Sequence, residues 1–201
     1  KLGRKLPEVL DIEEIDALLA AIDLSTPEGE RNHAMLETLY SCGLRVSELI
    51  GLRFSDLYFD EGFIRVIGKG NKERLVPVSG QVIKEISAYT EQTRLEVPIK
   101  RGQEHFIFLN RRGAALTRVM IFTIIRQLAE KISLQKQISP HTFRHSFATH
   151  LIEGGANLRA VQEMLGHESI TTTEIYTHLD RKFLRKTIIE HHPMYNGKMK
   201  R

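Results

Sequence analysis

The sequence predicts a mainly α-helical domain with one small antiparallel β-sheet, an α+β fold. Apolar residues recur at helical spacing over most of the chain. Three short β-type runs interrupt this pattern between residues 57 and 78, with turn-forming segments between them. The chain has 201 residues, 41% of them hydrophobic and 27% charged, so it can bury one full-sized core or at most two small ones. Since no internal repeat or linker divides the pattern, we expect one domain.

Two helices and the start of a third precede the predicted sheet. Asp11 and Glu14 form a capping-box signature, and this first helix should end near Asp23, where turn-forming residues follow. The second helix ends at Gly43, which suits a left-handed C′ position. Its apolar face carries Met35, Leu36, Leu39 and Tyr40. A short third helix begins at Arg45.

The β-type runs cover residues 57–59, 63–67 and 74–78, and Pro77 fits only near a strand end or on an edge strand. Residues 106–108 form a further short extended stretch. The remaining chain returns to helical spacing. The predicted helices are 82–95, 116–131, 140–153, 158–165, 170–176 and 182–190.

Helix boundaries are well marked in the second half of the chain. Ser139 and Pro140 suit the N-cap and N1 positions of one helix, which ends at two glycines. Asn157 caps the next helix, Gly166 ends it, and Ser169 can cap the helix that follows. These boundaries place several polar side chains at helix ends.

Composition excludes some classes of protein and leaves others open. The longest apolar runs fall far short of the roughly 18 residues of a membrane span, so we expect no membrane partner. The single cysteine, Cys42, cannot form an internal disulfide, which favours a reducing compartment. The opening residues do not resemble a secretory signal. A formal net charge of +4 permits nucleic-acid binding without demonstrating it.

Six polar residues have a shared purpose only when taken together. Individually, each has an ordinary explanation: Arg45, for example, can simply pair with Glu48 three residues later. As a set they comprise two arginines, a lysine, two histidines and a tyrosine, without an acidic pair to hold a metal. The set is Arg45, Lys69, His141, Arg144, His167 and Tyr176.

This combination suits a pentacovalent phosphate transition state. Two guanidiniums bind non-bridging oxygens in fork geometry, and His141 and Arg144 lie in the first turn of one helix, where the dipole attracts anions. The Tyr176 phenol, with an ordinary pKa of about 10, needs local positive charge to act as a nucleophile. A cation on a mobile hairpin, Lys69, can protonate the departing 5′-oxygen.

The order and wording of five motifs resemble the tyrosine recombinase (phage integrase) family, and most closely its Xer subgroup. The resemblance extends from about residue 6 to residue 193 and implies the catalytic-domain fold of that family. The motifs are CGLRVSEL at 42–49, GKGNKER at 68–74, SPHTFRHSFATH at 139–150, LGHESITTT at 165–173 and IYTH at 175–178.

The resemblance implies the role of each phosphate ligand and proton carrier. Arg45 and Arg144 would clamp the scissile phosphate, and His167 would bind it or orient the site. His141 would assist proton transfer, and Lys69 would be the general acid.

In the family the tyrosine, here Tyr176, forms a 3′-phosphotyrosyl bond to DNA and releases a 5′-hydroxyl. Attack by the 5′-hydroxyl of another strand reverses the step, which implies strand exchange without ATP, a metal or another cofactor. The expected partner is a double-stranded DNA recombination site, in chromosome-dimer resolution or mobile-element integration. We therefore expect a cytoplasmic enzyme that is associated with the nucleoid.

We expect three segments: a basic linker remnant at 1–9, the catalytic domain at 10–180, and a C-terminal helix with a basic tail at 181–201. The N-terminal DNA-binding domain that family members usually carry is absent from this chain. In the family the helix corresponding to 182–190 docks on a neighbouring protomer in a tetrameric synapse, although here it can also fold back on its own domain. The tail around Tyr195 should be disordered.

Further DNA contacts and rival functions follow from weaker signals. Candidate phosphate contacts are Lys72, Arg74, Arg118 and Arg126, each of which can equally belong to a solvated cationic face. A helix-turn-helix regulator without catalysis leaves the placement of Lys69 and Tyr176 unexplained. A type IB topoisomerase shares the tyrosine chemistry, and the Xer-like wording argues against it. A metal site at His141, His145 and His150 lacks further ligands at suitable spacing.

Overall fold

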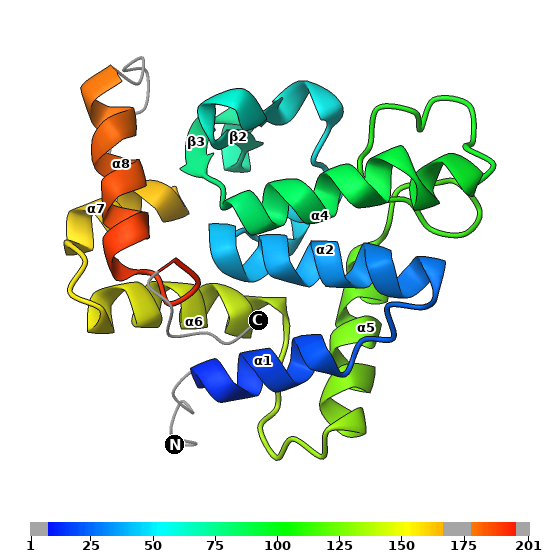
Figure 1. Cartoon of the computed structure of the whole chain (residues 1–201), viewed down its shortest axis with the longest axis horizontal. Helices are drawn as coiled ribbons and strands as arrows, with labels where there is room; N and C mark the ends of the chain where they lie inside the picture. Colours follow the sequence, from blue (N-terminus) through cyan, green and yellow to red (C-terminus); the bar gives the residue numbers. More distant parts are fainter. Residues whose placement is uncertain (1–7, 167–177, 196–201) are drawn as a thin grey trace.

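The computed structural model describes residues 8–166 and 178–195, and it has the predicted α+β architecture (Figure 1). Its helices are α1 (Ile12–Ala20), α2 (Pro27–Cys42), α3 (Val46–Ile50), α4 (Gly80–Glu91), α5 (Arg118–Lys131), α6 (Pro140–Glu153), α7 (Leu158–Leu165) and α8 (His178–His191). Short 3-10 turns are η1 (Phe54–Asp56), η2 (Phe59–Glu61), η3 (Lys69–Asn71) and η4 (Thr93–Glu96). The predicted helix at 170–176, with its Ser169 cap, lies outside the described residues.

The sheet has three antiparallel strands in the order β1 (Leu57–Tyr58), β2 (Phe63–Ile67), β3 (Glu73–Pro77). In the register between β2 and β3, Val66 lies opposite Arg74. Pro77 ends the edge strand β3, as predicted, so its missing N–H disturbs no central ladder. The β1 strand is shorter than predicted because Phe59 already begins a 3-10 turn.

Helix α2 forms the centre of the core. It lies between α1 and α4 and also packs against α6 (Figure 1). Because neighbours surround it, every residue from 34 to 42 is buried, rather than only the single apolar face that the sequence predicts. A helix enclosed on all sides buries polar side chains as well, and α2 buries Arg31, Thr38 and Ser41 along with its apolar residues.

Local capping explains most helix boundaries. Gly43 adopts a left-handed conformation (φ 63°) directly after α2, as expected of a C′ glycine. The Asn157 side chain accepts hydrogen bonds from the first turn of α7. The predicted capping box of α1 is absent: the Asp11 side chain makes no capping bond, and Glu14 instead pairs with Lys136 at 2.8 Å.

Two helical predictions differ from the structure in extent. The helix predicted at 82–95 is divided into α4 and η4 because the backbone at Gln92 leaves the helical region (φ −123°, ψ −84°). The extended stretch at 106–108 contributes one isolated bridge, between Phe106 and Arg53, and no strand of the sheet.

The C-terminal segment packs on the same core. Helix α8 lies against β3, α6 and α7, and it buries Leu184 and Ile188 while Phe183 and Ile189 stay exposed. The boundary expected at 180/181 therefore falls inside a packed helix. Tyr195 was expected in a disordered tail, and this is wrong: its ring contacts that of His192, with centroids 6.0 Å apart.

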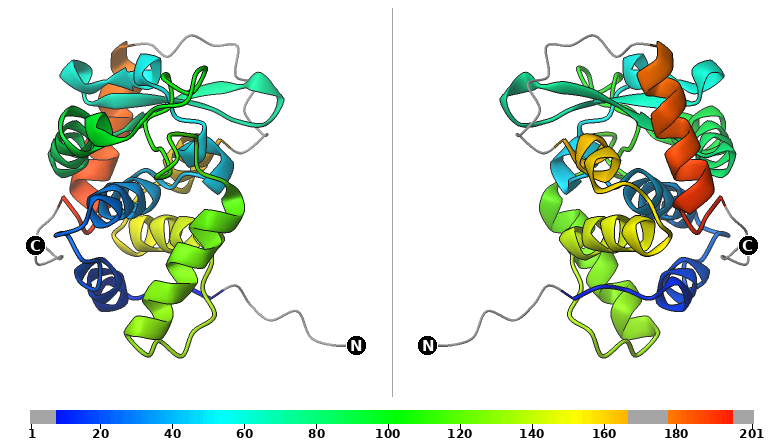
Figure 2. Two further views of the ribbon diagram at one scale, coloured as in Figure 1. Left: turned by 90° about the vertical axis from the view of Figure 1, so that its right-hand side faces the viewer. Right: turned by 90° about the vertical axis from the view of Figure 1, so that its left-hand side faces the viewer.

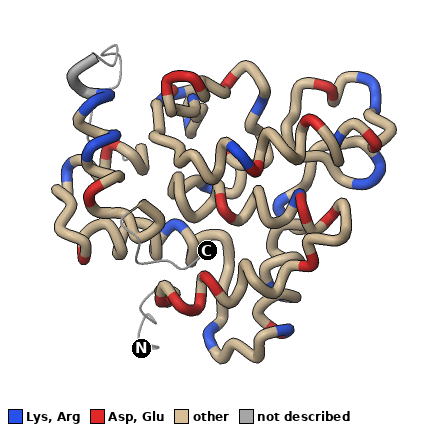
Figure 3. Tube along the Cα trace, viewed as in Figure 1, with Lys and Arg blue, Asp and Glu red and all other residues tan. Residues whose placement is uncertain are grey.

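The structure adds little to the interpretation of overall charge. Lys and Arg residues are spread along the whole trace rather than gathered on one element (Figure 3). Among the helices in the described ranges, none combines the length and apolar composition of a membrane span.

Candidate active site

Arg144 lies where three helices meet. From α6, its guanidinium donates to the backbone carbonyl of Gly43 (2.7 Å), just after α2, and to that of Leu165 (2.5 Å), the last residue of α7. The negative ends of both helix dipoles stabilise the cation. Burial and the nearby charge of Arg45 lower the pKa of Arg144 to about 10, so it stays charged at neutral pH. Within the described residues, two of its five N–H donors make these bonds.

Arg45 is the N-cap residue of α3 and follows by two residues the left-handed Gly43, whose carbonyl accepts a hydrogen bond from Arg144. The ordinary explanation for Arg45 is correct as far as it goes, because its Nη1 donates to Oε1 of Glu48 at 3.0 Å. This ion pair leaves 36% of the Arg45 side chain exposed, against 2% for that of Glu48. One face of the guanidinium thus stays open to a ligand.

Glu48 is the buried counter-charge of this group. Its carboxylate accepts hydrogen bonds from the Arg45 backbone and guanidinium and from both terminal nitrogens of Arg74. Burial by itself raises the pKa of Glu48, but the hydrogen bonds and charge of Arg74, the Arg45 backbone and the charge of Arg144 outweigh it, so the pKa is lowered. Arg45, Glu48, Arg74 and Arg144 are called the arginine junction below.

Arg74 differs from its predicted role as a DNA contact. It is 4% exposed, and all three guanidinium nitrogens donate to protein acceptors, one to the Met164 carbonyl and two to Glu48. A phosphate outside the protein has no access to it. The signal that the sequence prediction misses is the alternation of side chains along β3. Arg74 and Val76 lie on the same face of the strand and are both buried, while Leu75 between them is less buried.

Lys69 and His141 are exposed, five residues before Arg74 and three residues before Arg144 in the sequence. Lys69 begins the turn of the β2–β3 hairpin, which extends beyond the neighbouring helices (Figure 2). His141 is the second residue of α6. Within the described part of the chain, neither side chain makes a hydrogen bond or ion pair with the arginines. His167 and Tyr176 lie outside the described residues, and Gly166, the residue that caps α7, directly precedes His167.

A second buried polar group lies on the other side of α6. Tyr40 and His150 share a hydrogen bond of 2.7 Å, and the His192 ring packs on those of Tyr40 and Phe147. Tyr195 completes this C-terminal aromatic cluster of Tyr40, Phe147, His150, His192 and Tyr195. Since His150 is buried on Tyr40 while His141 and His145 are exposed, the structure does not bring the three histidines of the metal hypothesis to one place.

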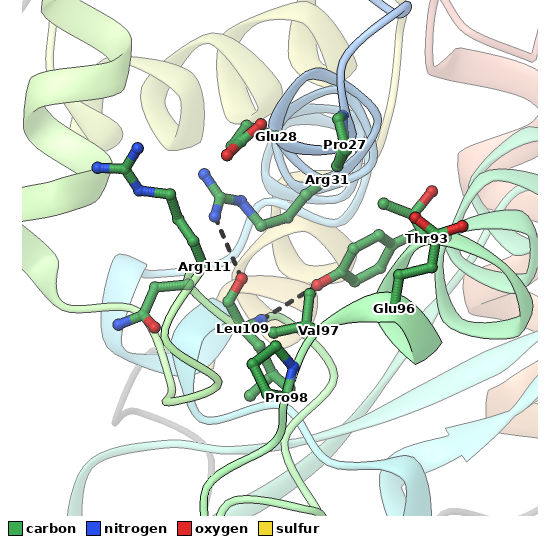
Figure 4. Close-up of a pocket in the computed structure, with 11 residues that line it drawn as sticks. Pro27, Glu28, Arg31, Thr93, Glu96, Val97, Pro98, Leu109 and Arg111 are labelled. Carbon is green, nitrogen blue, oxygen red and sulfur yellow. Dashed lines mark hydrogen bonds between the residues drawn. The ribbon is translucent and has the colours of Figure 1, made fainter.

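Two surface hollows lie in the described residues away from the junction. A groove of about 620 Å³ along α5 is lined by Arg118 and Arg126, with the exposed side chains of Val119 and Phe122 between them. A pocket of about 220 Å³ at the N-terminal end of α2 contains Arg31, whose guanidinium donates to the Leu109 carbonyl (Figure 4). Two arginines and two glutamates line this pocket, so it offers no net positive charge to DNA.

Three residues at the contact between α2 and α4 have side chains of the kind that bind metal ions. The ligand atoms of His33, Glu37 and Glu85 lie within 4.8 Å of one another. Nδ1 of His33 is 2.7 Å from a Glu85 oxygen, and this hydrogen-bonded pair accounts for the closeness of the two elements without an ion.

Known proteins resemble this chain over nearly its whole length. The phage integrase family matches residues 8–182. Tyrosine recombinase XerD of Staphylococcus epidermidis is 48% identical over 193 residues, covering 96% of this chain and 65% of that protein. XerD of Chlorobaculum tepidum is 50% identical over 196 residues, covering 96% and 64%. The chain thus spans just under two thirds of the length of these curated relatives.

Solved structures agree with the fold. The crystal structure of XerA recombinase superposes with a TM-score of 0.72 at 32% identity, covering 99% of this chain and 68% of that one. XerH site-specific recombinase, bound to its difH substrate in a pre-cleavage complex, gives a TM-score of 0.72 at 31% identity, covering 91% and 54%. The expected α+β recombinase fold is confirmed.

Proposed function

The chain belongs to the phage integrase family, and from this premise we propose that it is the catalytic domain of a site-specific tyrosine recombinase of the Xer type. The observation that supports the proposal best is the pairing of Arg45 with Arg144. The two arginines come from distant parts of the sequence, and Arg45 is close enough for its charge to lower the pKa of Arg144. Such a pair suits one phosphate with two non-bridging oxygens.

In the proposed reaction, Arg45 and Arg144 bind the scissile phosphate. Both are pre-positioned, Arg45 by Glu48 and Arg144 by two backbone carbonyls. Little reorganisation is therefore needed as negative charge grows in the transition state, which is where such preorganised donors contribute most.

The covalent step exchanges one phosphoester bond for another. The Tyr176 phenol gives its proton to His141 as its oxygen bonds to phosphorus, the P–O5′ bond breaks, and Lys69 gives a proton to the leaving 5′-oxygen. His167 binds or orients the phosphate. A 5′-hydroxyl of another strand then attacks the phosphotyrosine and gives its proton to Lys69, which restores the phosphodiester, while Tyr176 leaves and takes back the proton from His141. Atoms and charge balance at each step without ATP or a metal.

DNA contacts outside the reacting phosphate are assigned to Lys72, Arg118 and Arg126. All three are exposed, and the two α5 arginines line the groove described above. Such contacts would make binding fall steeply with salt. The partner is a double-stranded recombination site in the bacterial nucleoid, in the cytoplasm, used for dimer resolution or for integration.

We propose that four copies form the synapse on DNA. Within each copy, residues 1–9 are the linker and residues 10–180 are the catalytic segment. Helix α8, predicted at 182–190, packs on its own chain in this structure, and this supports the folded-back alternative for the state without DNA. The exposed Phe183 and Ile189 side chains remain available to a neighbouring copy.

Covalent trapping tests the proposal. The substrate is a pool of nicked duplexes with randomised sites. Cleavage releases a short fragment that carries the 5′-hydroxyl needed for religation, so any 3′-phosphotyrosyl adduct persists and can be captured. We expect an adduct with the unaltered chain, undiminished by EDTA, and none with Tyr176→Phe, which should still bind DNA. DNA binding with no adduct from the unaltered chain would favour a regulator, and relaxation of plasmid without partner exchange would favour a topoisomerase.

A further inference from the structure

Arg74 holds three parts of the chain at once. Its Nε donates to the carbonyl of Met164 near the end of α7 at 2.7 Å. Its two terminal nitrogens donate to the two oxygens of Glu48, at 3.1 and 2.6 Å. Arg74 itself belongs to β3, directly after the hairpin turn. The α3 helix, the hairpin and α7 therefore meet on one buried guanidinium.

Two glycines pack against this guanidinium. A Cβ on Gly166 would lie 3.0 Å from Cδ and 3.1 Å from Nη1 of Arg74, and Gly166 is left-handed (φ 71°). A Cβ on Gly68 would lie 3.5 Å from the same Nη1. Gly68 directly precedes Lys69, and Gly166 directly precedes His167. Arg74 thus touches the starting points of two segments that hold proposed catalytic residues.

We infer that Arg74 is a positioning residue that fixes the base of the Lys69 turn and the end of α7 at Gly166 relative to Arg45. The inference rests on the proposed function, because it concerns the groups that carry out cleavage. Glu48 completes the connection, since the carboxylate that holds Arg74 also holds Arg45. The Lys69 side chain is exposed at the start of the hairpin turn, so its reach depends on how the base of that turn is held.

Only arginine makes this set of contacts. A planar guanidinium reaches the two Glu48 oxygens with its terminal nitrogens while Nε points elsewhere, to Met164, whereas lysine is a single point donor on a flexible stem. Stability alone does not require the arrangement, because buried ion pairs are often no better than apolar residues of similar volume. The specific gain is a fixed relation between three chain segments.

Comparison of two substrates on one variant tests the inference. The first is the duplex captured by the unaltered chain, and the second carries a 5′-phosphorothiolate at the scissile position, whose sulfur leaves without a proton. The ratio of the two cleavage rates measures how well the acid is placed and does not depend on how much protein is folded. The variants are Arg74→Lys and, as a matched control, Arg94→Lys. Arg94 is also 4% exposed and also holds backbone carbonyls, those of Phe106 and Ile107.

Lys69→Ala should raise the ratio of the phosphorothiolate to the phosphodiester cleavage rate by about 100-fold or more over that of the unaltered chain. A general acid usually contributes a factor of this size. Arg74→Lys should raise the same ratio by about 10- to 100-fold, since a misplacement of about 1 Å can cost about 100-fold in rate. Arg94→Lys should leave it unchanged. If Arg74→Lys does not fold, the double variant Glu48→Gln, Arg74→Gln replaces the ion pair with neutral amides, and the same rise is expected.

The outcomes separate the inference from the proposed function. A rescued Lys69→Ala variant together with an unchanged ratio for Arg74→Lys would overturn the positioning role and leave the recombinase proposal intact. An equal rise for Arg94→Lys would also overturn it, because any buried arginine would then have the same effect. An adduct missing from the unaltered chain would instead remove the proposed function, and the inference with it.

Discussion

The arginine junction and the C-terminal aromatic cluster are both buried, both polar and both built partly on α6, yet they solve burial in opposite ways. The junction keeps its charges and pairs them, with four donors on the Glu48 carboxylate. The cluster keeps its titratable groups neutral and packs their rings in tilted and edge-on pairs. Charge is retained where a phosphate is proposed to bind, and it is avoided where the chain needs only packing.

Neutrality in the cluster is enforced by burial. His192 is 0% exposed, and among the described residues its Nε2 and the Tyr195 hydroxyl have no hydrogen-bond partner. Burial, and then the proximity of His150, lower the pKa of His192 to about 3. A charged imidazole there would be as costly as an unpaired Glu48 in the junction. The two regions should therefore respond differently to mutation and to pH.

The largest effect is expected from Glu48→Ala. It leaves the Arg74 guanidinium buried without its counter-charge and close to two other arginines, so the free energy of unfolding should fall by about 3–5 kcal/mol. Urea unfolding at pH 7 measures the loss. Glu73→Ala, on the hairpin that carries Arg74, is the control, because Glu73 is 58% exposed and its ion pair with Arg65 is long, at 3.9 Å, and such surface pairs contribute at most about 1 kcal/mol. Equal losses for the two variants would mean that the buried charges of the junction stabilise the fold no more than a surface ion pair does.

The junction also shows where sequence reasoning stops. Local signals placed the caps at Gly43, Asn157 and Gly166, because a cap depends on neighbouring residues in the chain. Arg74 was misassigned because its partner Glu48 is 26 residues away, and a basic hairpin looks the same whether its arginine faces a carboxylate or a phosphate.

The C-terminal segment shows the same limit from the other side. The polar composition around Tyr195 predicts disorder. In the structure, the chain directly after α8 places the His192 ring against those of Tyr40, Phe147 and Tyr195. Tertiary packing of that kind has no local signature. For the candidate site, residue chemistry could select Arg45 and Arg144, whereas only the fold could reveal what holds them.

Gly166→Ala should have the next largest effect. A left-handed alanine costs about 1–2 kcal/mol, and its Cβ also meets Arg74 at 3.0 Å, where overpacking adds about 1–3 kcal/mol. Gly155→Ala is the control beside the aromatic cluster: it too is left-handed (φ 95°), but its nearest neighbour is His191 at 3.6 Å. The difference between the two losses in unfolding free energy reports the close packing on Arg74, and a greater loss for Gly155→Ala would contradict it.

Mild acid should weaken the cluster before the junction. The folded pKa of His192 lies below its unfolded value of about 6.5, so the unfolded state binds more protons and stability falls as pH drops from about 6.5 toward 3. This costs about 1.4 kcal/mol per pH unit, or about 2 kcal/mol by pH 5. His150, whose pKa burial also lowers, acts in the same direction. The lowered pKa of Glu48 preserves its contribution above about pH 4.3, and that contribution is lost only in stronger acid.

Urea unfolding at pH 7, 6 and 5 distinguishes these contributions. His192→Phe removes one titrating group while keeping an aromatic ring, so its stability should depend less on pH over this range than that of the unaltered chain. Glu48→Gln should show the unaltered slope between pH 7 and 5. If Glu48→Gln made stability less dependent on pH and His192→Phe did not, the acid sensitivity would come from the junction and the prediction would be wrong.

The smallest effect is expected from Tyr40→Phe, which removes the hydroxyl that shares a 2.7 Å hydrogen bond with His150 and leaves the ring stack in place. A neutral hydrogen bond contributes about 1 kcal/mol net, so the unfolding free energy should fall by about that amount. Tyr89→Phe is the control, since its buried hydroxyl accepts a hydrogen bond from the Leu109 backbone at 3.2 Å, away from both regions. Similar losses for the two tyrosines would mean that the cluster is held by ordinary packing and neutral hydrogen bonds. A loss for Tyr40→Phe as large as that for Glu48→Ala would instead mean that the cluster, too, depends on an electrostatic network, and the contrast between the two regions would fail.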